Sequence, residues 1–336
     1  MEDCNPIGNA KLLGLGCSTF GGSKSKKIAL GALHTAFEKG ITYFDVARSY
    51  GYGQAESIVG EFIAGKRGQV IITTKFGIAP PRPFPFMSQI KDGVRWAKRF
   101  APGFTDTIIR SYSSSNVSRP AVTPDAAVAS LERSLKELRT DYVDYFLMHD
   151  CPYQSVVSDD LRERLEKEKE KGKLRVWGAT CENQEELPAF LSAKSPISVV
   201  QFPYSDSINF LENLASSDKS KVVFSVMSHR TDQVEQSPLF FGKLPINQIS
   251  PGTVENLREA WLYIACQELA SGVILCSMTQ AHHIERNLKI LEAPPISFFH
   301  LKWMKMAVKA GKLPMEVPGT PIPSSVAVGH PDYTGR

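Results

Sequence analysis

Residues 123–149 read TPDAAVASLERSLKELRTDYVDYFLMH and contain a helix-forming stretch followed by a strand-forming stretch. Thr123 is a good helix N-cap, Pro124 suits the first helical position, and Asp125 complements the helix dipole. Residues 142–148 then form a nearly continuous apolar run, which is typical of a parallel strand buried on both faces. The apolar residues of the helical stretch recur at helical spacing and mark one face: Val128, Leu131, Leu135 and Leu138.

The same alternation of a short apolar run and a longer amphipathic run extends along the chain. A helical pattern follows nearly every apolar run. Eight such units predict an α/β protein with a single domain, built as a closed (β/α)8 or TIM barrel of parallel strands. The expected strands cover residues 12–16, 41–45, 70–75, 142–148, 174–179, 197–201, 221–226 and 272–276.

The chain is longer than a typical barrel of this kind, which uses ~250 residues. It has 336 residues, and the excess falls in two places. Residues 77–122 form a long connection after the third strand, which we expect to be a substrate-side loop. Residues 314–336 are rich in Pro, Gly and Ser, and we expect an extended C-terminal tail there. The barrel domain is therefore expected over residues 1–313.

Composition narrows the class of protein. The chain is 42% hydrophobic and 22% charged, which is too apolar for a disordered protein. Its 39 basic and 35 acidic residues nearly balance, and this argues against a nucleic-acid partner. No apolar run reaches the roughly 18 residues of a membrane span, and residues 1–6 lack the pattern of a secretory signal. Because no two of the six cysteines have CxxC spacing, we expect a cytoplasmic protein with reduced thiols and no metal site.

Ionisable residues end three successive apolar runs. Asp45 ends the second run, Lys75 the third and His149 directly follows the fourth, while Tyr50 lies five residues after Asp45. In a parallel barrel the active residues lie at the carboxyl ends of the strands. One such residue is compatible with a surface salt bridge, but four at the same end of three neighbouring strands predict a shared site.

These four residue types fit one chemistry. A tyrosine with a pKa near ~10 is a poor acid at neutral pH, but the ammonium of Lys75 would stabilise the tyrosinate of Tyr50 and lower that pKa. Asp45 would keep Lys75 charged through an ion pair. Tyr50 would then give a proton to a carbonyl oxygen as hydride reaches the carbon, while His149 orients that oxygen.

Residues 40–60, GITYFDVARSYGYGQAESIVG, resemble the first signature of the aldo-keto reductase family. Residues 13–16 and 172–178 are also similar to that family, and the resemblance covers roughly residues 11–292. It implies a (β/α)8 barrel that binds a nicotinamide cofactor and reduces a small aldehyde or ketone, or oxidises the alcohol. The catalytic tetrad of the family corresponds to Asp45, Tyr50, Lys75 and His149.

The resemblance also implies cofactor contacts. Gln201 corresponds to the family's carboxamide-binding glutamine, and Thr180 keeps the hydroxyl of a Ser-Asn pair whose amide is lost at Cys181. Phe224 would stack on the nicotinamide, and Ser225 would meet the pyrophosphate. The full set of residues expected at the cofactor is Asp45, Thr180, Gln201, Phe224, Ser225, Ser277, Arg286 and Asn287.

Residues 277–287 are similar to the segment of the family that binds the adenosine phosphate, where helix N–H groups suit an anion. His283, Arg286 and Lys289 are the candidate cationic partners for a 2′-phosphate, and Asn287 corresponds to an adenine-contacting asparagine. Cys276 stands where some members have a lysine. NADPH is therefore favoured as the cofactor, with NADH as the alternative.

Other interpretations of these residues stay open. One is a cofactor-binding regulatory protein of the same fold with little turnover, which the departures from the family pattern at Cys181 and after Met227 favour. Another is a Schiff-base lyase with Lys75 as its nucleophile. Structural roles are also open: a rim salt bridge for Asp45 and Lys75, a strand end for Gln201, core packing for Phe224, and cap or turn positions for Ser277 and Asn287.

Overall fold

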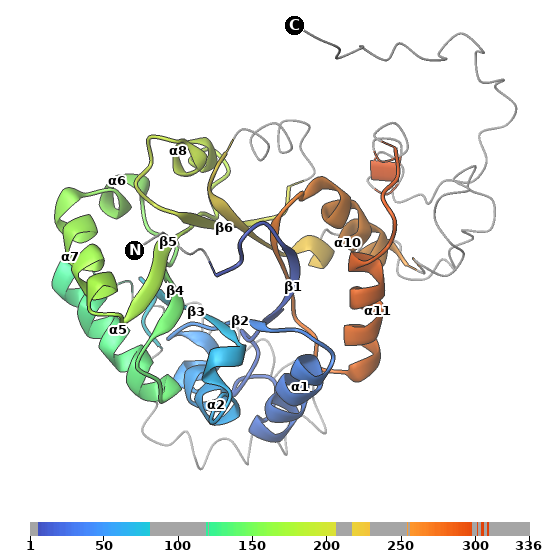
Figure 1. The fold of residues 1–336 in the computed structure, drawn as a ribbon, viewed down its shortest axis with the longest axis horizontal. Coiled ribbons are helices and arrows are strands. Elements are labelled where there is room, and N and C mark those ends of the chain that lie inside the picture. Colours follow the sequence, from blue (N-terminus) through green and yellow to red (C-terminus); the bar gives the residue numbers. More distant parts are fainter. Residues whose placement is uncertain are drawn as a thin grey trace, which may run out of the picture.

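The computed structural model describes residues 6–80, 119, 121–205, 217–228, 254, 256–297, 301, 304, 305 and 308. Within these ranges, eight parallel strands close into a barrel in chain order, with β8 paired to β1 (Figure 1). This confirms the predicted (β/α)8 fold. The strands are β1 (Lys11–Gly16), β2 (Tyr43–Asp45), β3 (Ile71–Phe76), β4 (Val143–Met148), β5 (Leu174–Thr180), β6 (Val199–Pro203), β7 (Ser220–Phe224) and β8 (Gly272–Cys276).

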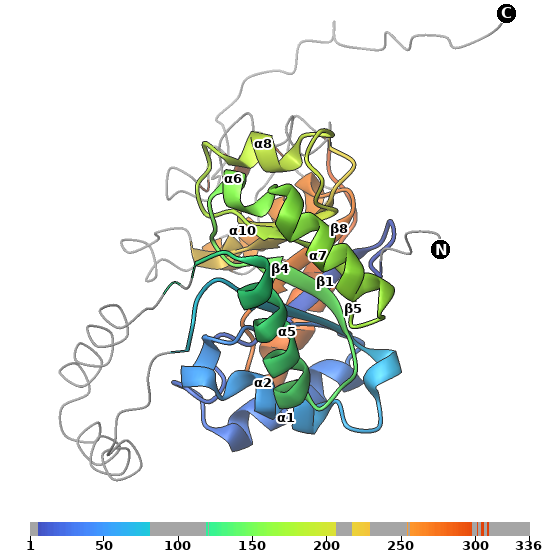
Figure 2. The same ribbon diagram turned by 90° about the vertical axis from the view of Figure 1, so that its left-hand side faces the viewer.

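Helices surround the barrel and cover the outer face of its strands (Figures 1 and 2). Around this ring α1 packs against both α2 and α11, and α5 packs between α2 and α7. The α-helices are α1 (Lys26–Glu38), α2 (Ala55–Phe62), α5 (Pro124–Leu138), α6 (Tyr153–Val156), α7 (Asp159–Glu170), α8 (Leu187–Leu191), α10 (Leu257–Glu268) and α11 (Ala281–Leu291). Short 3-10 helices are η1 (Tyr50–Gly53), η2 (Arg67–Gln69) and η3 (Val226–Ser228).

The predicted strands agree with the structure to within two residues at each end. The largest shifts, of two residues, are at β2, β6 and β7. β7 ends at Phe224 rather than at residue 226 because Ser225 adopts a φ of 59°, which a strand cannot continue through. The expected long loop lies mostly outside the described residues, and the expected tail lies entirely outside them.

The helix predicted from Thr123 forms as α5. The Thr123 hydroxyl accepts a hydrogen bond from the Ala126 N–H at 3.3 Å, and Pro124 is the first helical residue. The helix ends where Arg139 enters the left-handed region with a φ of 54°. Leu131, Leu135 and Leu138 are buried as predicted, while Val128 is only half-buried.

Apolar side chains fill the inside of the barrel and the layer between strands and helices. Ile7 packs with the interior cluster, and its N–H donates to the Tyr145 hydroxyl at 3.2 Å. Gly178 lets β5 approach β6, because a Cβ at this position would lie 2.0 Å from the Val199 carbonyl oxygen. The interior cluster consists of Ile7, Tyr43, Tyr145, Leu147, Val176, Val199, Val222, Val273 and Leu275.

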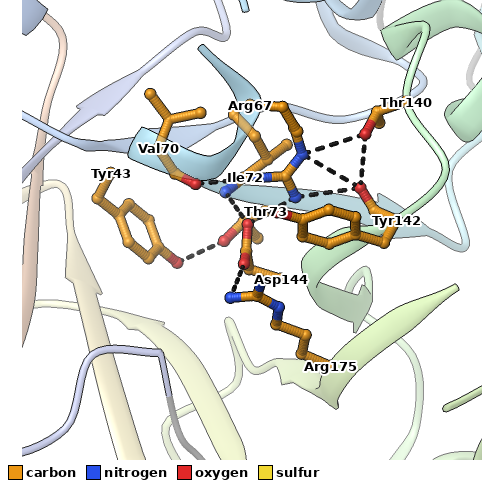
Figure 3. Close-up of polar contacts among 9 residues, drawn as sticks. All are labelled: Tyr43, Arg67, Val70, Ile72, Thr73, Thr140, Tyr142, Asp144 and Arg175. Carbon is orange, nitrogen blue, oxygen red and sulfur yellow. Dashed lines mark hydrogen bonds and ion pairs between the residues drawn. The ribbon is translucent and has the colours of Figure 1, made fainter. Parts of the chain in front are cut away.

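A polar network at the amino-terminal ends of β3, β4 and β5 centres on Asp144 (Figure 3). This buried carboxylate accepts from Arg67 at 2.7 Å and from the Ile72 N–H at 2.8 Å. Arg175 lies 3.0 Å from the other carboxylate oxygen as an ion pair without hydrogen-bond geometry. The two guanidinium groups lie 3.8 and 4.6 Å from the centre of the Tyr142 ring. Asp144 therefore joins three strands at the end of the barrel opposite the predicted site.

Asp144→Ala should destabilise the fold by about 3–5 kcal/mol, because it leaves Arg67 and the Ile72 N–H without their buried acceptor. Arg175→Ala should cost at most about 1 kcal/mol, since the Arg175 side chain is 51% exposed. Urea unfolding followed by circular dichroism compares the two variants with the parent protein. Equal losses in both variants would contradict the central position of Asp144.

Candidate active site

Asp45 and Lys75 form a buried ion pair at the carboxyl ends of two neighbouring strands. Asp45 ends β2 and pairs with Thr73 of β3, so the residue two positions further along β3 is brought beside it. Lys75 Nζ lies 2.6 Å from Asp45 Oδ2, and both side chains are almost inaccessible to solvent. The ammonium also donates to the Val46 carbonyl oxygen at 3.3 Å.

Tyr50 completes the hydrogen bonds of the lysine. Its hydroxyl accepts from Lys75 Nζ at 3.0 Å. The loop reaches this position because Gly51 adopts a φ of 57° and packs against the backbone of Phe20. A Cβ at Gly51 would lie 1.7 Å from the Phe20 carbonyl oxygen, so only glycine permits this turn.

His149 follows β4 and faces the tyrosine. The backbone N–H of His149 donates to the Phe76 carbonyl oxygen at 2.5 Å, and this bond anchors His149 beside the end of β3. The imidazole meets the Tyr50 ring edge-on, with ring centres 5.9 Å apart and an angle of 84°. All four predicted catalytic side chains are therefore brought together at one end of the barrel.

Burial and neighbouring charges act in opposite directions on the pKa values of Lys75 and Tyr50, and in the same direction on that of His149. Burial disfavours the Lys75 ammonium, but Asp45 and Tyr50 outweigh it and raise the pKa of Lys75. Burial raises the pKa of Tyr50 above its ordinary value, and the field of Lys75 only partly offsets this. Lys75 acts on the pKa of Tyr50 in the predicted direction, but the prediction left out the cost of desolvating a phenolate, which is larger and makes the net shift upward. Burial and Lys75 lower the pKa of His149 to about 3, so its imidazole is neutral.

The four side chains line a cavity of about 550 Å³. Of the residues predicted at the cofactor, those in the cavity wall are Asp45, Thr180, Gln201, Phe224, Ser225, Ser277 and Asn287. Arg286 is not part of this wall. Its guanidinium donates to both carboxylate oxygens of Glu259, at 3.0 and 2.6 Å. The residues predicted at the cofactor, from Thr180 at the end of β5 to Asn287 in α11, thus line the same cavity.

The side-chain amide of Gln201 shows whether a nicotinamide group suits this cavity. Its side-chain nitrogen donates to Asp45 Oδ1 at 3.2 Å, which fixes the orientation of the amide. Its oxygen Oε1 is buried and has no hydrogen-bond partner. A buried acceptor without a partner is costly, and the carboxamide N–H of a nicotinamide is a donor that would satisfy it. The residues present therefore fit this cofactor.

The two residues that end and follow β5 behave differently. The Thr180 hydroxyl accepts from the Asp150 N–H at 2.7 Å, so its own proton remains to be donated to a ligand in the cavity. The Cys181 thiol donates to the Asn183 carbonyl oxygen at 3.0 Å and does not line the cavity. The departure from the family pattern at Cys181 therefore removes a polar contact without putting a thiol in its place.

Sequence reasoning missed several polar residues of the cavity wall. Glu182 lies two residues after β5, and its position after a strand was a usable signal. Asn256, Arg258 and Glu259 come from the start of α10. No sequence pattern marked these three residues, because their position in the cavity wall depends on how α10 packs against α11.

No group of three metal-ligating side chains occurs in the part of the chain that the structure describes. The described helices also include none that is long and apolar enough to cross a membrane.

The fold and these side chains define a TIM barrel with a buried lysine–aspartate pair, a tyrosine and a histidine at the carboxyl end of its strands. The sequence profile of the Aldo/keto reductase family matches residues 12–269, and the chain belongs to that family.

Individual relatives are more distant. Aldo-keto reductase YhdN of Bacillus subtilis is 29% identical over 201 residues, which cover 58% of this chain and 50% of YhdN. The uncharacterized oxidoreductase YqkF of the same organism is 28% identical over 190 residues, covering 56% of this chain and 50% of YqkF. The chain thus spans about half the length of the curated relatives it matches.

Solved structures show the same fold at lower identity. The holo form of aldo-keto reductase AKR11C1 from Bacillus halodurans has a TM-score of 0.63 and 18% identity, covering 88% of this chain and 91% of that protein. An aldo-keto reductase from Klebsiella pneumoniae, solved in complex with NADPH, has a TM-score of 0.59 and 20% identity. The match covers 88% of this chain and 90% of that protein.

The neutral state of His149 predicts a pH dependence of stability. Its pKa of about 3 in the folded protein lies below the ordinary value of ~6.5 expected in the unfolded chain. Between these values the unfolded chain binds one proton more, so stability falls as the pH drops through this window. His149→Gln should remove up to about 1.4 kcal/mol per pH unit from the slope of the unfolding free energy.

Urea unfolding at a series of pH values between about 4 and 6 measures this slope. His34→Gln, at an exposed histidine of α1, is the matched control. An unchanged slope in His149→Gln, or an equal change in both variants, would contradict the prediction.

Proposed function

We propose that the protein is an NADPH-dependent oxidoreductase that reduces a small aldehyde or ketone to an alcohol, or catalyses the reverse reaction. The observation that carries the proposal is the hydrogen-bonded chain from Asp45 through Lys75 to Tyr50, with His149 beside it in the wall of the cavity. A bound nicotinamide would supply the hydride. The residues of the chain would manage the proton and the substrate oxygen.

Tyr50 is the proposed general acid. When a carbonyl oxygen gains negative charge, the phenol donates its proton, and the phenolate that forms lies 3.0 Å from the Lys75 ammonium. That ammonium is held by Asp45, so its charge is in place before the reaction begins. Burial makes the free phenolate unfavourable, which keeps Tyr50 protonated until the substrate oxygen takes the proton.

His149 is the proposed donor that orients the substrate oxygen. Because its imidazole is neutral, one ring nitrogen carries a proton and can donate to a carbonyl oxygen. A neutral donor stabilises developing charge without competing with Tyr50 for the role of acid. The same geometry disfavours Lys75 as a Schiff-base nucleophile, because its ammonium protons are used by Asp45, Val46 and Tyr50.

The cofactor contacts are proposed along the wall of the cavity. Thr180 and Gln201 would hold the carboxamide, Phe224 and Ser225 would meet the nicotinamide ring and the pyrophosphate, and Ser277 with Asn287 would bind the adenosine end. NADPH is favoured because Arg258 and His283 also line this end and Arg286 lies beside it. Glu259 weakens this preference, because its carboxylate neutralises Arg286.

A regulatory protein that binds the cofactor with little turnover is the second candidate. The orientation of Cys181 favours it, because one expected contact to the cofactor is missing. The intact arrangement of Asp45, Tyr50 and Lys75 supports the enzyme.

We also propose a single catalytic domain over residues 1–313, a C-terminal tail over residues 314–336, and action in the cytoplasm on a small molecule. The cysteines that the structure describes are all free thiols, which suits a reducing compartment.

Tyr50→Phe should lower kcat for carbonyl reduction by about 10²- to 10⁴-fold, because it removes the hydroxyl that gives the proton. It should leave the affinity for NADPH within about twofold, because Tyr50 is not among the proposed cofactor contacts. Steady-state kinetics on an aldehyde and ketone panel, with fluorescence titration of NADPH, separates the two effects. Tyr52→Phe in the same loop is the matched control and should keep full turnover. Unchanged turnover in Tyr50→Phe would refute the assigned role, and tight NADPH binding without turnover in the parent protein would favour the regulatory candidate.

Glu259→Gln should raise the affinity for NADPH relative to NADH by about three- to tenfold, because it removes a negative charge near the 2′-phosphate and releases Arg286. Parallel titrations of both nucleotides measure the ratio. Glu285→Gln, on the same surface helix as Arg286 but paired with Lys39, is the control. If the ratio is unchanged, this end of the cavity does not hold the 2′-phosphate.

A further inference from the structure

Glu182 is a charged residue of the cavity wall that the proposed mechanism does not use. It follows β5 at the same end of the barrel as His149, and both side chains line the cavity together with Thr180. Within the described part of the chain, Glu182 makes no hydrogen bond or ion pair. Burial raises the pKa of Glu182, the nearby Asp150 carboxylate adds to this, and Arg119 partly offsets it.

The positive groups near this end of the cavity, among the residues that the structure describes, are already engaged. Arg119 donates to the Asp150 carbonyl oxygen at 2.9 Å and lies 2.8 Å from the Asp150 carboxylate. Lys75 is bound by Asp45 and Tyr50, and His149 is neutral. Among the described residues here, the charge of Glu182 is therefore the one without a compensating partner.

The same cavity contains buried polar atoms that await a ligand. His149 is 8% exposed, and its ring nitrogen Nδ1 has no hydrogen-bond partner. Gln201 is 3% exposed, and its oxygen Oε1 is likewise unpartnered. Both side chains line the cavity with Glu182. Gln201 Oε1 is the acceptor assigned above to the cofactor carboxamide, so a substrate held by His149 binds in a cavity whose wall contains Glu182.

From this arrangement, and resting on the proposed function, we infer that Glu182 sets the charge preference for the substrate. The enzyme takes neutral or cationic carbonyl compounds, favours those with a hydroxyl or ammonium group near the carbonyl, and discriminates against carboxylates and phosphates. A carboxylate about 6 Å from a substrate charge, at the effective dielectric of a protein surface or of water, changes binding by roughly 3- to 100-fold.

A series of para-substituted benzaldehydes tests this inference. The trimethylammonio, tert-butyl and carboxylate derivatives place a positive, a neutral and a negative group at the same position. In the parent protein kcat/KM should follow that order. Glu182→Gln should lower the ratio of the cationic to the anionic substrate by about tenfold, mainly through KM, and leave the neutral substrate within about twofold. Glu182→Lys should reverse the order.

Glu185→Gln is the matched control. It removes the same charge from the same loop; both side chains are exposed, but Glu182 lines the cavity and Glu185 does not. An unchanged ratio in Glu182→Gln, or an equal change in Glu185→Gln, would overturn the inference. A change in NADPH affinity in Glu182→Gln with no change in the ratio would place Glu182 at the cofactor and overturn it as well.

Binding of the three corresponding benzyl alcohols to the NADP⁺-loaded protein gives the charge order without turnover. Charge-ordered binding that depends on Glu182, in a protein that reduces none of the aldehydes, would refute the proposed function and support the charge preference. Binding without any charge order would refute the charge preference, whatever the turnover.

Discussion

The burial of Lys75 against Asp45 is the constraint on which the rest of the site depends. An ammonium inside a protein costs several kcal/mol unless a counter-ion and hydrogen-bond acceptors replace water. Here the acceptors that replace water are Asp45, the Val46 carbonyl and the Tyr50 hydroxyl, whose oxygens lie 2.6, 3.3 and 3.0 Å from Lys75 Nζ. Two of these acceptors come from the end of β2 and the third from the loop beyond it, so the lysine fixes the loop relative to β3. The turn at Gly51 is the backbone condition for that arrangement.

The ion pair also determines the protonation states of its neighbours. Burial favours the neutral form of Tyr50 and of His149, while the ammonium favours phenolate over phenol and disfavours an imidazolium. Both effects keep His149 neutral. They oppose each other at Tyr50, which therefore stays protonated but has a cation ready for the charge that it would acquire. One buried charge thus gives two adjacent side chains different roles.

Sequence patterns predicted what depends on local order along the chain. The eight apolar runs, the cap at Thr123, and the polar residues that end β2, β3 and β4 are local features, and the barrel brings their ends together. Interactions between distant elements were not predictable. The pairing of Arg286 with Glu259 needs α10 to lie on α11, and the turn that ends β7 at Ser225 needs a backbone conformation unusual for serine. The raised pKa of Tyr50 required the degree of burial, which the sequence does not contain.

Among the described residues, three carboxylates line one cavity and differ in the positive group that balances them. Asp45 is committed to Lys75, and Glu259 is bound by Arg286 through two hydrogen bonds, so each is part of a neutral pair. Glu182 has no such partner among the described residues. A neutral pair has a weak field at a distance, whereas a single charge acts on every ligand that enters. The proposed electrostatic selection by Glu182 therefore involves a different carboxylate from the proposed catalysis and from the proposed adenosine contacts. A change at Glu182 alters it without disturbing the buried pair that holds the site together.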